Sequence, residues 1–238
     1  MKSLVIIKVG NSIPELIPHS GDYEDWIAAG LHNPGPVRVI DPRRGDDLPE
    51  PKMTAGAIIT GSHAMVTDRE TWSERTGRWL AQLVDREIPL LGICYGHQLL
   101  AQALGGEVVY HPGGTEIGTV QIRSTDAAAG DPLFNIMPAL FPAQTVHRQS
   151  VARLPRDAVI LAANDFEAHH AFRIGARAWG VQFHPEFSAV AMRGYIEHLS
   201  ENLRSEKRDP QSLLDAVTET PAATSLLGRF AAIALETP

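Results

Sequence analysis

The stretch PLLGICYGHQLLAQALGG, residues 89–106, contains Cys94, the only cysteine in the 238-residue chain. The apolar run over residues 89–93 is typical of a buried parallel strand, and residues 98–104 have the spacing of a helix that ends at two glycines. Cys94 therefore lies at a predicted turn from strand to helix, between Gly92 and Gly96. We expect a strained turn of the nucleophile-elbow type, with the thiol at the edge of a sheet.

A thiol at such a turn can act as a nucleophile, because the N-terminus of a helix favours the thiolate. The backbone N–H of Tyr95 would point toward an oxyanion formed at the attacked carbon. Gly61, at the end of another apolar run, could present a second N–H to the same oxyanion. The alternatives are a small buried cysteine without chemistry and a plain turn at Gly61.

Strand and helix patterns alternate through the first half of the chain. Apolar runs predict four strands, over residues 4–9, 37–40, 57–60 and 89–93. Helical spacing predicts helices over residues 22–29 and 69–86 in addition to the one after Cys94. This order predicts an α/β fold, a mostly parallel sheet with helices on both faces, which binds ligands at the carboxyl ends of its strands.

The second half of the chain has a different pattern. Short predicted strands cover residues 107–110, 118–123, 139–146, 158–162, 168–174 and 178–183. They indicate an antiparallel β extension before the chain returns to the sheet. After residue 187 the pattern is helical, with breaks at Asp209–Pro210 and Thr220–Pro221. We expect one domain over residues 1–190 and a C-terminal helical extension over residues 191–238 packed on it, with a dimer interface on the last helix as the alternative.

The composition, 44% hydrophobic and 21% charged, is that of an ordinary globular protein. A net charge of -7 argues against a nucleic-acid or anionic membrane partner, and no apolar stretch approaches transmembrane length. The single cysteine excludes an internal disulfide and is typical of a reducing compartment, so we expect a cytoplasmic protein. We find no metal-ligand cluster, phosphate loop or dinucleotide fingerprint, so we expect no metal and no cofactor.

A base for the thiol is predicted in WGVQFHPEFS, residues 179–188. The apolar run before His184 would deliver it to the carboxyl edge of the sheet, and Pro185 makes a short rigid turn to Glu186. Glu186 could hold one imidazole nitrogen and leave the other to take the proton of the thiol. The alternative is a surface turn, which explains neither the preceding apolar run nor the matching elbow.

These motifs together resemble the class I, or triad, glutamine amidotransferases. The resemblance rests on GICYGHQLLAQALGG (92–106) and GVQFHPEFS (180–188), and extends to TGSHAMVTD (60–68), EIGTVQI (116–122) and TVHRQSV (145–151). It covers about residues 4–187 and is strongest for stand-alone proteins similar to the amidotransferase domain of GMP synthase. It implies a flavodoxin-like sheet with an antiparallel extension.

The resemblance also implies roles for individual residues. Cys94 would attack the side-chain amide of glutamine and form a γ-glutamyl thioester, with His184 as the base and then the acid, and Glu186 as its orienting group. Gly61 and Tyr95 would form the oxyanion hole. The α-carboxylate or α-amino group of glutamine would be held by Gln98 and by the stretch His147, Arg148, Gln149 and Ser150, the latter largely through its backbone.

The resemblance leaves the acceptor of the ammonia open. We find no match to the ATP pyrophosphatase loop of GMP synthase, so we do not expect the chain to make GMP alone. It would either hand ammonia to a separate synthetase or hydrolyse γ-glutamyl compounds with the same triad, as the similar plant γ-glutamyl peptidases do. A non-enzymatic subunit or ligand-binding protein is least favoured, because the set of Cys94, His184 and Glu186 is complete.

Overall fold

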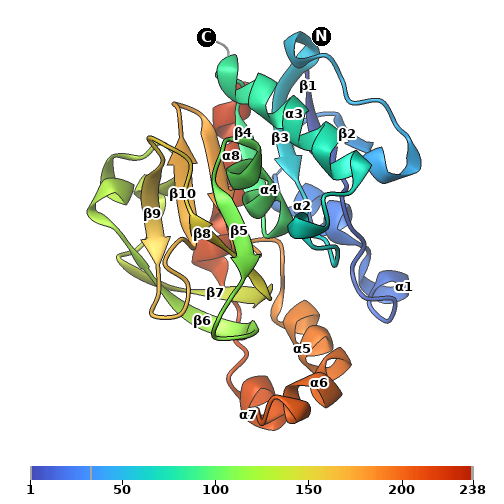
Figure 1. Cartoon of the computed structure of the whole chain (residues 1–238), viewed down its shortest axis with the longest axis vertical. Coiled ribbons are helices and arrows are strands. Elements are labelled where there is room, and N and C mark those ends of the chain that lie inside the picture. Colours follow the sequence, from blue (N-terminus) through green and yellow to red (C-terminus); the bar gives the residue numbers. More distant parts are fainter. Residues whose placement is uncertain (1, 33, 237–238) are drawn as a thin grey trace.

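The computed structural model describes residues 2–32 and 34–236 (Figure 1). One half of its main sheet is parallel. The strands of this half lie in the order β2 (Val37–Ile40), β1 (Ser3–Ile7), β3 (Thr54–Ile59), β4 (Leu90–Ile93) and β11 (Ala178–Val181). The other half is antiparallel and continues with β10 (Ala171–Ile174), β9 (Val159–Ala163), β6 (Glu116–Ser124) and β7 (Leu140–His147). This arrangement confirms the predicted mixed sheet, in which a parallel part with helices on both faces is continued by an antiparallel extension.

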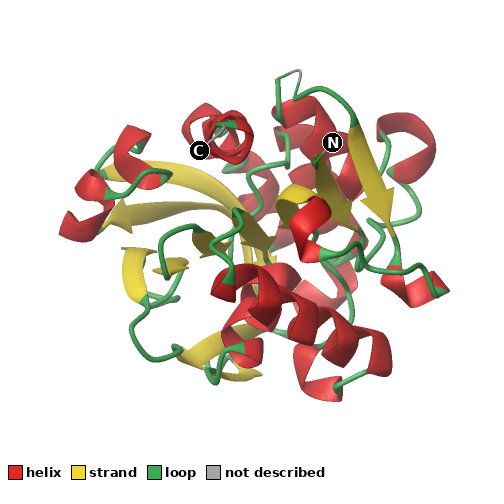
Figure 2. Ribbon diagram, turned by 90° about the horizontal axis from the view of Figure 1, so that it is seen from above, coloured by secondary structure: helices red, strands yellow, loops and turns green. Residues whose placement is uncertain are grey.

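Helices cover both faces of the sheet (Figure 2). On one face lie α3 (Thr71–Asp85) and α4 (Tyr95–Ala103), and on the other lie α2 (Tyr23–Gly30) and α8 (Pro221–Leu235). Successive residues of a strand point to opposite faces, so Val5 and Ile7 pack with α3 and α4, whereas Leu4 and Ile6 pack with α2 and α8. Strands buried on both faces are continuously apolar, which is why these runs were recognisable in the sequence.

Several predicted boundaries differ from the structure. β11 ends at Val181, two residues before the predicted end, and the chain then turns so that the amide of His184 donates to the carbonyl of Gln144 in β7. β10 begins at Ala171 rather than at residue 168, because the amide of His169 turns toward the carboxylate of Glu167. β1 and β3 also begin and end earlier than predicted.

A second, two-stranded sheet joins β5 (Glu107–Tyr110) to β8 (Gln149–Arg153). β8 was not predicted, because its sequence QSVAR contains one β-branched residue and no polar–apolar alternation. The short helix α1 (Ile17–Ser20) was not predicted either, because it begins with a proline in its first turn and has no buried residue.

The chain leaves the sheet after β11 and forms a separate group of helices at one end of the molecule (Figure 1). This group contains α5 (Ala189–His198), α6 (Ser200–Ser205) and α7 (Pro210–Asp215). The predicted break at Asp209–Pro210 is confirmed, since the carboxylate of Asp209 caps α7 by accepting the amides of Gln211 and Ser212. The break at Thr220–Pro221 is confirmed as the start of α8.

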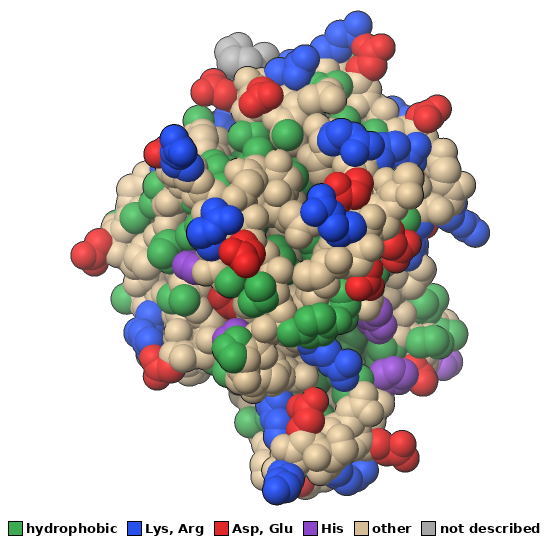
Figure 3. Space-filling view, in the orientation of Figure 1, with side chains coloured by type: hydrophobic (Ala, Val, Ile, Leu, Met, Phe, Trp, Pro, Cys, Tyr) green, Lys and Arg blue, Asp and Glu red, His purple; other side chains and the backbone are tan. Residues whose placement is uncertain are grey.

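The last helix returns to the sheet and is part of its core. Leu226, Leu227 and Phe230 are fully buried, and the ring of Phe230 meets the ring of Trp179 edge to face at 6.3 Å. This packing supports our proposal that residues 191–238 are an extension of the domain that residues 1–190 form. Acidic and basic side chains are interspersed on the face of the molecule that Figure 3 shows. Across residues 2–32 and 34–236, none of the helices has the length and apolar character needed to cross a membrane.

We predict that Phe230→Ala lowers the free energy of unfolding by about 3–5 kcal/mol, because it leaves a cavity between α8 and the sheet. Chemical denaturation should still show a single transition, since α8 and the sheet share one core. Ser225→Ala, an exposed substitution on the same helix, should change the value by less than about 0.5 kcal/mol. An additional unfolding transition of the wild-type protein at lower denaturant concentration would contradict the prediction that α8 and the sheet unfold together.

Candidate active site

Cys94 occupies a strained turn between β4 and α4. Its φ of 50° and ψ of -98° lie in a region that non-glycine residues rarely adopt, at a cost of about 1–3 kcal/mol. Two hydrogen bonds hold the turn: the amide of Cys94 donates to the carbonyl of Val181 in β11 at 2.8 Å, and its carbonyl accepts the amide of Gln98 at 3.1 Å. The elbow predicted from the sequence is therefore present.

The two glycines beside Cys94 are required by close backbone contacts. A Cβ on Gly92 would lie 2.4 Å from the carbonyl oxygen of Gly96, and a Cβ on Gly96 would lie 2.7 Å from the carbonyl oxygen of Ile59 in β3. Any side chain at either position would push α4 away from the sheet. The glycines thus let the helix start directly above the strand ends.

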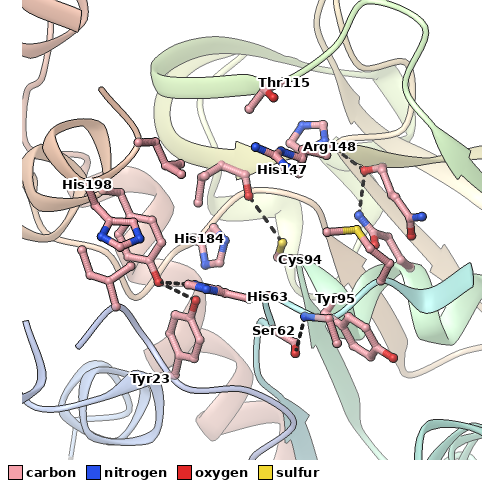
Figure 4. Close-up of a pocket in the computed structure, with 18 of the residues that line it drawn as sticks. Tyr23, Ser62, His63, Cys94, Tyr95, Thr115, His147, Arg148, His184 and His198 are labelled. Atoms are coloured by element: carbon pink, nitrogen blue, oxygen red, sulfur yellow. Dashed lines mark hydrogen bonds between the residues drawn. The ribbon is translucent and has the colours of Figure 1, made fainter. Parts of the chain in front are cut away.

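Cys94 is 7% exposed, and its thiol faces a cavity of about 250 Å³ (Figure 4). Its Sγ lies 3.7 Å from the carbonyl oxygen of Val146, at the end of β7. The cavity lies at the carboxyl edge of the parallel strands, where this type of sheet binds ligands.

His184 and Glu186 form a buried pair beside the thiol. Nδ1 of His184 lies 2.8 Å from Oε1 of Glu186, and the backbone amide of His184 donates to the carbonyl of Gln144. Burial alone would lower the pKa of His184, but the negative charges of Glu186 and Cys94 outweigh it and raise the pKa to about 10. The imidazole therefore stays protonated at neutral pH, and its Nε2 has no hydrogen-bond partner in the described part of the chain.

Two backbone amides are available beside the thiol. A Cβ on Gly61 would lie 2.9 Å from Cε1 of His184 and 3.8 Å from Cβ of Cys94, so the Gly61 backbone borders both. Neither the Gly61 amide nor the Tyr95 amide donates a hydrogen bond to any described residue. The Tyr95 side chain turns away into the core, where its hydroxyl pairs with that of Ser73 at 2.7 Å.

The residues expected to hold the α-groups of glutamine are divided between two environments. His147, Arg148, Gln149 and Gln98 line the cavity, whereas Ser150 does not. The amide of the Gln98 side chain donates to the carbonyl of Gln149 at 2.7 Å. Arg148 is exposed and forms no ion pair within the described residues.

A buried polar cluster behind the cavity was not found from the sequence. The carboxylate of Glu116 lies within hydrogen-bond distance of Nε2 of His147, at 2.9 Å, and 3.2 Å from Nε2 of His170. Burial alone would raise the pKa of Glu116, but the two imidazoles hold it well below its usual value. The cluster holds the end of β7, next to Arg148, and no local motif links residues so far apart in the sequence.

The C-terminal helices also supply a wall of the cavity, which the sequence did not indicate. The wall is formed by Tyr195 and His198 of α5, Asn202 of α6, and Leu199 between the two helices. Helical spacing places Tyr195 on the buried face of α5, next to Ala191 and Met192. Nothing in the sequence of α5 tells which part of the sheet this face covers.

Comparison with known proteins identifies the family. The profile of the family "Glutamine amidotransferase class-I" matches residues 47–198. The chain belongs to the class I glutamine amidotransferases. The match passes the predicted domain boundary at residue 190 and includes α5.

Individual relatives agree with this family. The chain is 32% identical to a GMP synthase of Aeropyrum pernix over 72% of its own length, but spans only 32% of that protein. It is 30% identical to a subunit of the glutamine-hydrolyzing GMP synthase of Methanopyrus kandleri, over 72% of this chain and 87% of that one. It is 29% identical to γ-glutamyl peptidase 5 of Arabidopsis thaliana, over 72% of this chain and 68% of the relative.

A solved structure agrees with the fold. The crystal structure of a glutamine amidotransferase from Thermotoga maritima superposes with a TM-score of 0.78 at 23% identity, over 100% of both chains.

The described residues contain no group of three or more His, Cys, Asp or Glu side chains arranged to hold a metal ion.

We predict that His184→Ala slows the alkylation of Cys94 by iodoacetamide at pH 7, because the thiolate loses its cationic neighbour. Glu186→Gln, which keeps the imidazole but removes the orienting charge, should give an intermediate rate. The rate is measured as adduct mass against time. His19→Ala, on the exposed surface of α1, serves as the control and should match the wild type. Equal rates in His184→Ala and wild type would show that the imidazole does not act on the thiol.

Proposed function

We propose that this enzyme hydrolyses the side-chain amide of glutamine through a γ-glutamyl thioester on Cys94 and releases glutamate and ammonia. The observation that carries the proposal is the grouping of the Cys94 thiol, an imidazole paired to a buried carboxylate, and two backbone amides without an acceptor among the described residues. Each of these groups has a part in acyl transfer through a cysteine nucleophile.

The reaction would proceed in two halves. The thiolate of Cys94 attacks the amide carbon, and the amides of Gly61 and Tyr95 stabilise the oxyanion. When the C–N bond breaks, the imidazolium of His184 gives its proton to the departing nitrogen, which leaves as ammonia. His184, held by Glu186, then takes a proton from water, and the water oxygen attacks the thioester carbon. The C–S bond breaks, which restores the Cys94 thiolate and the His184 imidazolium, and the new carboxyl group loses its remaining proton to solvent as glutamate leaves.

The γ-glutamyl half of the substrate would lie on the side of the cavity lined by Gln98 and Gln149. Arg148, a cation with no acidic partner among the described residues, is suited to the α-carboxylate. In this orientation the departing nitrogen faces His184. Glu116 would act at a distance, by fixing His147 and hence the backbone next to Arg148.

Two family activities fit this chemistry. The relatives named GMP synthase support an ammonia donor that serves a separate synthetase, and the relative named γ-glutamyl peptidase supports a hydrolase of γ-glutamyl compounds. One observation bears on the hydrolase: the cavity wall beside His184 is completed by α5 and α6 of the chain itself. We favour the amidotransferase activity, and we infer that glutamine hydrolysis proceeds without a partner because the site is already assembled.

We predict that the purified protein releases glutamate and ammonia from glutamine, and that a diazo-ketone analogue of glutamine adds once per chain, at Cys94. Cys94→Ala should lose both turnover and labelling and keep the fold, as circular dichroism would show. The adduct is located by mass spectrometry after proteolysis. An adduct at another residue, or turnover by Cys94→Ala, would contradict the proposal.

We further predict that kcat/KM for a γ-glutamyl dipeptide is less than one hundred times kcat/KM for glutamine. A hundredfold preference for the dipeptide corresponds to about 2.7 kcal/mol of transition-state binding gained from the second amino acid. Steady-state release of glutamate from both compounds measures the ratio. A preference of that size would replace the amidotransferase activity with the peptidase activity.

A further inference from the structure

One end of the cavity, which we call the aromatic lobe, lies next to His184 (Figure 4). Of the residues that line the cavity, it contains Ile13, Tyr23, Tyr195 and Leu199, which pack in one cluster, and His63, which is joined to Tyr195. The ring of Tyr23 lies 6.1 Å from the imidazole of His184, centre to centre. Because His184 gives its proton to the departing nitrogen in the proposed function, any substituent on that nitrogen would enter this lobe.

We propose that the aromatic lobe is a subsite for the amine portion of γ-glutamyl amides, and that it accepts small uncharged alkyl amines in preference to amino acids. The proposal rests on the proposed function and specifies its substrate class. The chemistry is unchanged, since only the substituent on the departing nitrogen differs: the C–N bond breaks, His184 supplies the proton and the free alkylamine leaves.

The hydrogen-bond donors of the lobe are already used within the protein. A tyrosine hydroxyl can donate one hydrogen bond and accept two. The hydroxyl of Tyr195 donates to Ser12 at 3.4 Å and lies within hydrogen-bond distance of Tyr23, at 2.6 Å, and His63, at 3.2 Å. Since Tyr195 donates to Ser12, it accepts from Tyr23 and His63, and the protons of all three side chains are used within the protein. The lobe therefore offers the substrate ring faces and the side chains of Ile13 and Leu199, but no free donor for a carboxylate.

The lobe also lacks a free cation for a carboxylate, since the imidazolium of His184 beside it is already paired with the carboxylate of Glu186. Nδ1 of His198, at the rim of the lobe, lies 3.3 Å from a carboxylate oxygen of Glu15, so His198 already has an acidic partner. Partial burial and the neighbouring imidazoles of His198 and His184 lower the pKa of His63, so its ring is neutral at neutral pH. Arg148 lies at the other end of the cavity, beside His147 (Figure 4). A carboxylate on the departing amine would enter the lobe without a partner, which is unfavourable.

Three substrates that share the γ-glutamyl half test the proposal through one product, glutamate. We expect kcat/KM for γ-glutamylethylamide to exceed that for γ-glutamylglycine by about tenfold or more. γ-Glutamylglycinamide, which has the size of the glycine compound without its charge, should fall with the ethylamide. The carboxyl group makes glycine the better leaving group, so intrinsic reactivity acts against this order. Equal or faster hydrolysis of γ-glutamylglycine would overturn the proposal.

A substitution in the lobe tests its location. Leu199→Lys places a cation there and should lower the ratio of ethylamide to glycine hydrolysis by about tenfold. Val190→Lys adds the same charge on α5, at an exposed position that does not line the cavity, and should leave the ratio and both rates unchanged. An unchanged ratio in Leu199→Lys, with the fold intact, would overturn the proposal.

Binding to Cys94→Ala separates this proposal from the proposed function. If no compound yields glutamate, the hydrolysis mechanism fails. Calorimetric affinities of the same three compounds for Cys94→Ala still test the lobe, because the order requires no thiol. We expect the two neutral compounds to bind more tightly than γ-glutamylglycine, and equal affinities would overturn the subsite.

Discussion

The strained backbone of Cys94 is the constraint on which the rest of the site depends. A positive φ at a non-glycine residue persists only where the surroundings leave no alternative. Here the carbonyl of Val181 holds the amide of Cys94 from one side, and the contact between Gly96 and Ile59 holds the helix from the other. Relaxing the turn would require separating α4 from β3, β4 and β11, the centre of the sheet. The energy of core packing therefore keeps the thiol at the sheet edge.

Three adjacent strands each deliver one part of the site. In the order β3, β4 and β11, their carboxyl ends are followed by Gly61, Cys94 and His184. The register pairs Val181 with Ile93, so the imidazole, three residues beyond Val181, lies next to the thiol, one residue beyond Ile93. Parallel pairing is what brings residues far apart in the chain to one edge. The Pro185 turn then returns Glu186 to the imidazole.

The substrate cavity extends beyond this central edge. The antiparallel extension contributes the end of β7, with Val146 and its neighbours, and the C-terminal helices contribute the opposite wall. The hydroxyl of Tyr195 joins α5 to the loops that follow β1 and β3, through Ser12 and His63. This contact means that a helix after the triad residues helps to shape the space on the side of His184. The two ends of the cavity consequently differ in chemistry, with an unpaired cation at one and aromatic rings at the other, within the part of the chain that the structure describes.

The sequence by itself determined the central architecture, because its determinants are local. Continuous apolar runs, helical spacing and the glycines around Cys94 indicate the buried strands, the helices and the elbow without reference to distant residues. The position of His184 after a strand-like run and the turn to Glu186 were likewise predicted from local sequence. Strand ends were misplaced by up to three residues, since pairing with a distant strand ends a ladder. β8 was missed because tertiary contacts, rather than strand propensity, stabilise it.

Only the tertiary structure decided the remaining surroundings of the site. The cluster of Glu116, His147 and His170 joins distant segments of the chain, and its ionisation depends on burial and on distances that no spacing encodes. The apolar pattern of α5 predicts that Tyr195 is buried, but it does not predict which part of the sheet α5 covers. The apolar face of an amphipathic helix can pack on many different apolar surfaces. Local sequence therefore specified the reacting groups, whereas packing between distant segments specified the space in which a substrate meets them.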